Sequence, residues 1–186
     1  MPRIGYLAAA VVMTGAVLVA LVHRPNTAER AADLRAFVSD MQADIGSCAA
    51  DVGASLTALR AIESGTSTNI ATARVIATSG AADCSPANDE LIDDLIQYEV
   101  TESLASFRLD RVVTGLIAWA APDAQRVQTD IAAVLSARTG AARQAATAAL
   151  DRALHVLDAQ RASVDRIIRS ASTALSARAS PPLLPG

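Results

Sequence analysis

The stretch that decides the fold is LDRALHVLDAQRASVDRIIRSASTAL, residues 150–175. Its seam positions alternate in steps of four and three, the spacing that keeps side chains on one face of an α-helix. The seam consists of Leu150, Leu154, Leu157, Arg161, Val164, Ile168, Ala171 and Leu175. This pattern predicts one long amphipathic helix over about residues 141–179, whose stripe must face other helices.

A second helix of similar length is predicted near the start of the chain. Asn26 can cap its first turn, and Glu29 can reach back to the cap, as in a capping box. The four-three spacing continues through Val52 and then Ser55 or Leu56, towards Gly65, a natural stop. The seam residues are Leu34, Val38, Met41, Ile45, Cys48, Val52, Leu59 and Ile62. Such a helix of about 40 residues would be about 60 Å long if straight.

Shorter helices are predicted between these two. Residues 65–69 have the composition of a turn, and a short helix over about residues 68–79 would end at Gly80. Ser85 followed by Pro86 is typical of a cap and a first helical residue, so a separate helix is expected to start there. After a break at 100–101, a further helix is expected to bury Leu104, Leu109, Val112, Val113, Leu116 and Trp119.

Pro122 interrupts that pattern. Proline disfavours helix at the preceding residue and has no N–H to donate, so it predicts either a kink or the start of a new helix. Asp123 suits a helix start, because a carboxylate is favoured there. The apolar stripe resumes up to Arg138, and Thr139 with Gly140 forms a second weak point. The resumed stripe consists of Ala124, Val127, Ile131 and Val134.

Together these segments predict an all-α fold: an elongated antiparallel bundle of three to five helices, two of them long, over residues 26–179. The Pro-rich residues 180–186 cannot continue a helix and are expected to form a flexible tail. Each seam is expected to pack inside the bundle, although its length would also suit a coiled-coil dimer. Hydrophobic residues make up 52% of the chain and aromatic residues 3%, which favours closely packed alanine-rich helices.

Residues 1–25 precede the bundle. Within them, residues 4–22 form an uncharged apolar run of 19 residues, which as a helix would be about 28 Å long and match a bilayer's hydrocarbon core. Leu18, two positions before Ala20, is bulkier than a small-x-small cleavage site usually allows, so a transmembrane anchor is favoured over a cleaved signal. Arginines beyond the run favour a cytoplasmic body. The cysteine pair favours an extracytoplasmic body, which is our expectation.

The chain contains two cysteines, Cys48 and Cys84. Cys48 lies on the inward seam of the first helix, and Cys84 directly precedes Ser85. A helix descending to Gly65 and a chain returning through residues 66–84 bring both cysteines to the same level. We therefore predict a disulfide that pins a helical hairpin; two free buried cysteines are the alternative.

The net charge of −3 and the absence of lysine give no basic domain of the kind that binds nucleic acid. No basic residue occurs between Arg74 and Arg108. That interval holds Asp83, Asp89, Glu90, Asp93, Asp94, Glu99 and Glu102. We expect either a solvated acidic face or neutralisation by the final helix, which is rich in arginine. The carboxylates match no EF-hand pattern, so no metal site is predicted.

No catalytic or cofactor motif is present, because the chain has neither a Gly-x-Ser-x-Gly elbow nor a glycine-rich phosphate loop. His155 flanks the seam of the last helix, and Trp119 is expected to be a core anchor. We therefore expect a non-enzymatic, membrane-anchored scaffold that docks another envelope protein or self-associates through its seams. Alternatives are an extracytoplasmic ligand-binding or sensing module, and a secreted soluble protein after signal cleavage.

Overall fold

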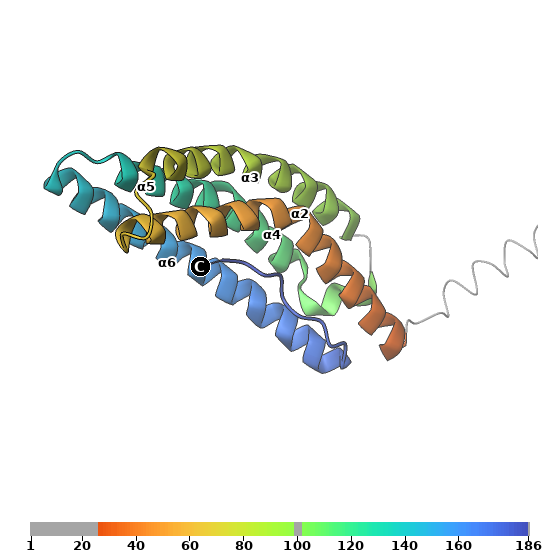
Figure 1. The fold of residues 1–186 in the computed structure, drawn as a ribbon. Helices are drawn as coiled ribbons and strands as arrows, with labels where there is room; N and C mark the ends of the chain where they lie inside the picture. The colour runs from red at the N-terminus through yellow and green to blue at the C-terminus, as the bar shows by residue number, and fades with distance from the viewer. Residues whose placement is uncertain (1–25, 99–101, 186) are drawn as a thin grey trace, which may run out of the picture.

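A computed structural model describes residues 26–98 and 102–185, and these form an all-α fold (Figure 1). Four helical rods pack together: α2 (Thr27–Glu63), α3 (Ile70–Tyr98), a kinked rod built of α4, η2 and α5, and α6 (Gly140–Leu175). The short 3₁₀ helix η1 (Glu102–Phe107) leads into α4 (Asp110–Ala118). The all-α class and the bundle with two long helices are confirmed.

The predicted transmembrane anchor, residues 4–22, lies outside the described residues, as does the predicted break at 100–101. Across residues 26–98 and 102–185, no helix has both the length and the hydropathy needed to cross a bilayer.

The two long helices begin close to the predicted residues, and α2 also ends as predicted, whereas α6 ends at Leu175, four residues before the predicted end at Ala179. The Asn26 side chain accepts a hydrogen bond from the Glu29 amide at 2.9 Å, and the Glu29 carboxylate accepts one from the Asn26 amide at 2.8 Å. This capping box starts the 37 residues of α2, which end just before Gly65 at φ +74°. The 36 residues of α6 start after Thr139, whose hydroxyl accepts from the Ala142 amide. Capping groups satisfy amides that have no partner within the helix.

Most residues of both predicted seams are buried inside the bundle, whereas Ile62, Leu154 and Arg161 are only partly buried. Leu34, Met41 and Ile45 of α2 are fully buried, as are Leu157 and Ile168 of α6. The residues expected in the core of the α4 region are buried too: Leu104, Leu109, Val112, Val113, Leu116 and Trp119. The expected single helix is nevertheless divided, because Arg108 at φ 57° separates η1 from α4. Burial of the seams favours internal packing over a coiled-coil dimer.

The predicted division of residues 68–98 into two helices is wrong. The structure has a single 29-residue helix, α3, which continues through Gly80 and Pro86. Gly80 is buried where α3 meets α2 and α5, so its lack of a side chain serves close packing rather than helix termination. Cys84 therefore lies in the middle of a helix, not at a helix entry. Tertiary contacts along α3 outweigh the local signals to stop.

Pro122 kinks the third rod, as one of the two predicted outcomes. The π-helical turn η2 (Trp119–Ala124) joins α4 to α5 (Gln125–Ser136), and Ala121 has extended backbone angles of φ −145° and ψ 112°. This agrees with the steric rule that the residue before proline leaves the helical region. Asp123 lies inside the turn rather than at the start of a helix.

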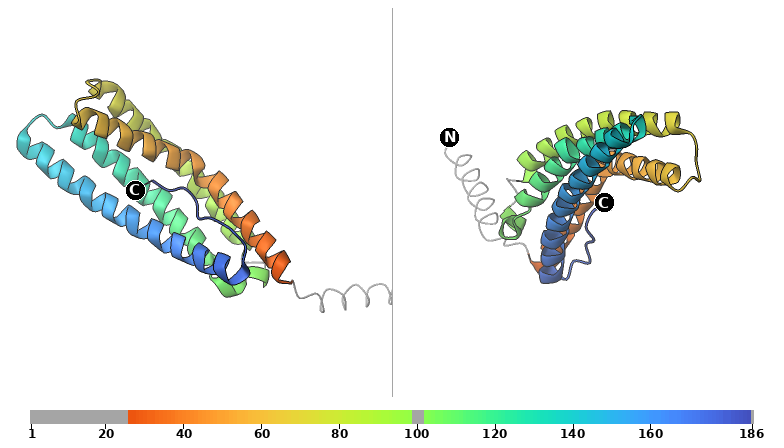
Figure 2. Two further views of the ribbon diagram at one scale, coloured as in Figure 1. Left: turned by 60° about the horizontal axis from the view of Figure 1, so that its bottom comes forward. Right: turned by 90° about the vertical axis from the view of Figure 1, so that its left-hand side faces the viewer.

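The C-terminal tail was expected to be loose, but the structure places residues 177–185 against α2 and α6 (Figure 2). Arg35 donates to the carbonyl of Ala177 at 3.1 Å, and the Leu183 amide donates to the Gln42 side chain at 2.7 Å. Leu184 is 7% exposed, whereas Leu183 is 83% exposed. The tail thus covers apolar surface that the helices alone leave open.

The difference in exposure between Leu184 and Leu183 predicts different effects of substitution at these two neighbouring residues. Leu184→Ala is expected to release the tail and to lower the free energy of unfolding by about 1 kcal/mol, because buried methyl groups are lost at a site free to collapse. Leu183→Ala should leave stability unchanged, because its side chain faces solvent. Carboxypeptidase digestion and urea denaturation measure both effects. Equal digestion rates for the two variants would show that Leu184 does not hold the tail.

Candidate functional site

A disulfide joins the middle of α2 to the middle of α3. Cys48 and Cys84 are bonded at an S–S distance of 1.97 Å, with their Cα atoms 4.6 Å apart. Both are fully buried, and the described residues contain no free cysteine. The predicted pairing of Cys48 with Cys84 is present in the structure, and it pins the α2–α3 hairpin as expected. A bond of this kind is typical of an oxidising compartment outside the cytoplasm.

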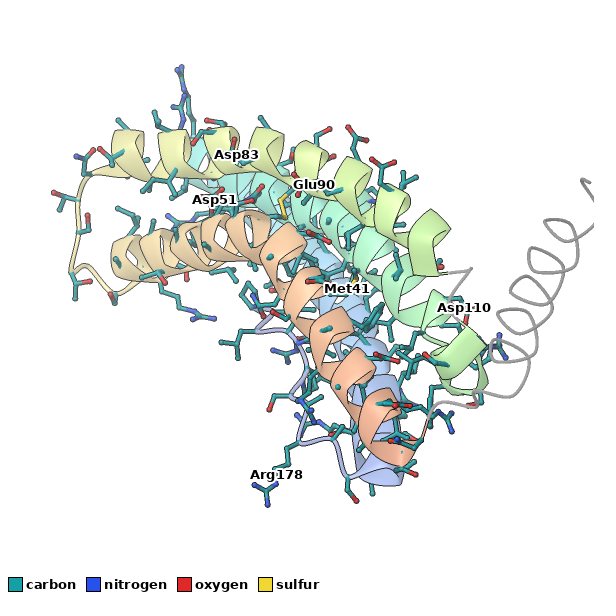
Figure 3. The ribbon with its side chains drawn as sticks, turned by 90° about the vertical axis from the view of Figure 1, so that its right-hand side faces the viewer. Met41, Asp51, Asp83, Glu90, Asp110 and Arg178 are labelled. Carbon is teal, nitrogen blue, oxygen red and sulfur yellow. A yellow bond between two sulfur atoms is a disulfide. The ribbon has the colours of Figure 1, made fainter. Side chains whose placement is uncertain are left out.

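Two carboxyl groups face each other beside this disulfide. Asp51 lies one turn after Cys48 on α2, and Asp83 directly precedes Cys84 on α3 (Figure 3). Burial raises the pKa of Asp51 above its ordinary value of 3.8, and the Asp83 charge and a side-chain hydrogen bond with Asp83 raise it further. The sequence analysis included Asp83 in the acidic interval but missed Asp51, because their proximity depends on how α2 and α3 pair.

Asp51→Asn is expected to stabilise the protein at neutral pH. Because the folded pKa of Asp51 is raised, folding favours the protonated acid, and stability falls as pH rises from about 4 through the folded pKa. An amide removes that penalty and can donate to Asp83. The gain at pH 7 is expected to be about 0.5–1 kcal/mol, since partial exposure screens the charges, and to vanish below about pH 3.

Denaturant titration at both pH values measures this gain. Asp151→Asn, at an exposed position on α6, is the matched control and should change little. A gain of the same size at low pH would contradict the assignment to charge repulsion.

A buried glutamine, Gln128, lies next to the carboxyl pair. Gln128 of α5 is fully buried, and among the described residues neither polar atom of its amide has a hydrogen-bond partner. A Cβ added to Gly80 would lie 2.6 Å from the Gln128 amide nitrogen and 2.9 Å from the Asp51 Cβ. Three helices therefore meet at Gly80 at a distance that only glycine permits.

An arginine-lined pocket lies away from the disulfide, where η1 and the start of α4 meet the end of α6. Its volume is about 320 Å³, and its charged lining consists of Arg108, Arg111 and Arg166, with Ser106 and Ser170 beside them. Asp110 pairs with Arg108 at 3.6 Å, and both side chains are more than half exposed. Among the described ion pairs, none includes Arg111 or Arg166. The arginines come from separate parts of the sequence, so no local motif indicates this pocket.

Two further pockets are less suited to a charged ligand. One of about 200 Å³ lies between η2 and α6, with Asp123, Arg126 and Arg152 in its lining, and burial raises the pKa of Asp123. The other, of about 440 Å³, lies between α2 and the tail and is lined mainly by small and apolar residues. Small-molecule sites usually occupy about 300–1,000 Å³. The first of these pockets is smaller than that, and the second has no charged residue in its lining, so the arginine-lined pocket is the better candidate for a charged ligand.

The described part of the acidic face of α3 is solvated. Asp89, Glu90 and Asp93 are exposed, and α3 packs mainly against α2, α4, η2 and α5. The described ion pairs of the final helix, Arg161 with Asp158 and Arg169 with Asp165, lie within α6, and the kinked rod lies between α3 and α6, so neutralisation of the described part of this face by α6 is not seen. Three large apolar side chains are exposed on the same helix: Ile70, Val75 and Ile92.

The histidine and the tryptophan considered in the sequence analysis lie in different parts of the fold. His155 is exposed on α6, and Trp119 is fully buried in the core. Within residues 26–98 and 102–185, no three His, Cys, Asp or Glu side chains gather closely enough to hold a metal ion. No protein-family model, curated protein or solved structure matches this chain.

Proposed function

We propose that the chain is a non-enzymatic interaction protein, anchored in a membrane by residues 4–22, whose helical body lies outside the cytoplasm. The apolar run supports the anchor. The Cys48–Cys84 disulfide supports an extracytoplasmic body. Because the helices pack into a closed bundle, the outer surface of this body is the part that would bind a partner protein.

The observation that carries this proposal is the outer face of α3. Its first half exposes Ile70 and Val75, the latter at 64%, and its second half exposes Asp89, Glu90 and Asp93. Most residues of the heptad seams pack in the core of the bundle. The proposed contact with a partner therefore involves the outer face of α3 and not the seams. A partner that matches α3 would carry a basic surface next to an apolar one, because opposite charges steer and orient association.

Photocrosslinking in cells tests the proposal. A photoreactive residue at Val75 should yield a discrete adduct with another envelope protein, whereas the same residue at Ala159, exposed on α6, should yield none. Replacing Asp89, Glu90 and Asp93 by their amides should weaken the Val75 adduct without changing thermal stability. Monomer alone at both positions would contradict the proposal, as would fractionation of the full chain away from membranes.

An alternative is an extracytoplasmic ligand-binding module, which the arginine-lined pocket favours because three guanidinium groups gather there. A ligand that binds only the folded state raises the melting temperature. Thermal shift with a panel of organic anions and phosphates measures this, and a secreted mature chain would show the same behaviour without co-fractionating with membranes.

A further inference from the structure

We propose that the arginine-lined pocket binds the phosphate of an anionic phospholipid headgroup in the membrane that holds residues 4–22. The inference rests on the proposed anchor and adds a second, charge-specific contact between the body and the bilayer. Arg108, Arg111 and Arg166 supply the cationic lining, and the hydroxyls of Ser106 and Ser170 supply further donors. Guanidinium groups bind phosphate oxygens through paired, charge-assisted hydrogen bonds.

The pocket is tied closely to the start of α2. Arg30, in the first turn of that helix, donates to the Ser103 carbonyl at 2.8 Å and to the Ser106 hydroxyl at 3.0 Å. Its guanidinium also lies over the Phe107 ring, 5.1 Å from the centroid. Ser106 and Phe107 both line the pocket. These contacts hold η1, and with it one wall of the pocket, against the first turn of the bundle.

Chain length then places the pocket near the headgroups. Five residue steps separate Val22, the last residue of the apolar run, from Thr27, the first residue of α2. At about 3.6 Å per step, these cannot carry the start of α2 more than about 18 Å from the hydrocarbon edge. The headgroup layer itself is about 5–8 Å deep on each side. η1, the start of α2 and the end of α6 all lie at this same end of the bundle (Figures 1 and 2).

Charge decides which lipid fits. Two of the three lining arginines, Arg111 and Arg166, take part in no ion pair among the described residues. A zwitterionic headgroup would bring its own ammonium group to this cationic surface, whereas an anionic headgroup without an amine, such as phosphatidylglycerol, adds only negative charge. Attraction between basic residues and anionic lipids falls off within a Debye length, so it acts on groups held this close to the membrane.

The test uses the full chain in lipid nanodiscs of phosphatidylcholine alone or mixed with phosphatidylglycerol. Arginine modification by phenylglyoxal is followed residue by residue with mass spectrometry. Arg111 and Arg166 should react more slowly, by about threefold or more, in discs that contain phosphatidylglycerol. Arg60, Arg74 and Arg143, exposed near the opposite end of the bundle, should react equally in both discs.

Variants separate a specific pocket from general attraction. The pair Arg111→Gln and Arg166→Gln should abolish the protection of Arg108 by phosphatidylglycerol, whereas Arg60→Gln with Arg74→Gln should preserve it. Raising the salt concentration should weaken the protection, because screening acts on exposed charges. Thermal melts of both double variants report whether the fold is retained; all four positions are solvent-exposed.

Three outcomes would overturn the inference. Equal modification rates in the two kinds of disc exclude selectivity for anionic lipid. Full protection by inorganic phosphate in phosphatidylcholine discs, with no effect of phosphatidylglycerol, assigns the pocket to a soluble phosphate instead. Failure of the chain to remain in phosphatidylcholine discs overturns the anchor, and that result is distinguishable because it does not depend on lipid charge.

Discussion

Replacing both Cys48 and Cys84 by alanine is expected to lower the free energy of unfolding by about 3–4 kcal/mol. The bond joins residues 36 apart in sequence, so its loss lets the unfolded hairpin explore many more conformations. Both side chains are fully buried, and alanine is close to cysteine in size. The loss of the cross-link is therefore the main effect, and the bundle should still fold.

Urea denaturation in the presence and absence of reductant measures this cost. Reductant should destabilise the wild-type chain to about the level of the double variant and should leave the double variant unchanged. Thiol labelling of the native protein from cells should find neither cysteine reactive. Two reactive thiols in cytosolic material would contradict both the bond and the extracytoplasmic body.

The second large effect concerns alanine substitutions at two glycines, for which we expect changes in stability of opposite sign. Gly80→Ala is expected to destabilise by about 2 kcal/mol, because overpacking a close helix contact typically costs about 1–3 kcal/mol. The added methyl would lie 2.6 Å from the Gln128 amide nitrogen, which can move with its side chain, and 2.9 Å from the Asp51 Cβ, which cannot move without its helix. Gly46→Ala is expected to stabilise by about 0.5–1 kcal/mol, because alanine is the better helix former. Its nearest neighbour is the flexible Gln42 amide at 3.9 Å.

Denaturation of the two single variants under identical conditions decides the matter. Both positions lie inside long helices, so helix propensity alone predicts stabilisation at both. Stabilisation by Gly80→Ala would show that α2, α3 and α5 can separate at little cost. A third variant, Gly80→Ala combined with Gln128→Ala, should recover part of the loss, since it removes the amide that the new methyl would meet.

Local sequence signals account for much of the fold. Asn26 with Glu29 and Thr139 with Ala142 start the two long helices through short-range hydrogen bonds. Pro122 kinks the third rod through its own ring and its missing N–H. The cysteine pairing could also be predicted, because helix rise and the reach of the returning chain bring Cys48 and Cys84 to one level. The arginine-lined pocket could not be predicted from the sequence. Arg111 and Arg166 lie 55 positions apart and come together only through the packing of α4 on α6.

The sequence by itself thus determined the helical class, the two long helices with their buried seams, and the cysteine pair. These follow from periodicity and from contacts within a few residues, which are the same in any tertiary arrangement. The tertiary structure alone decided that α3 runs unbroken through Gly80 and Pro86, that the tail lies against α2, and that three arginines line one pocket. Each of these depends on contacts between distant segments, and the free energy of such contacts exceeds the small local preferences of about 1 kcal/mol that a single glycine or cap provides.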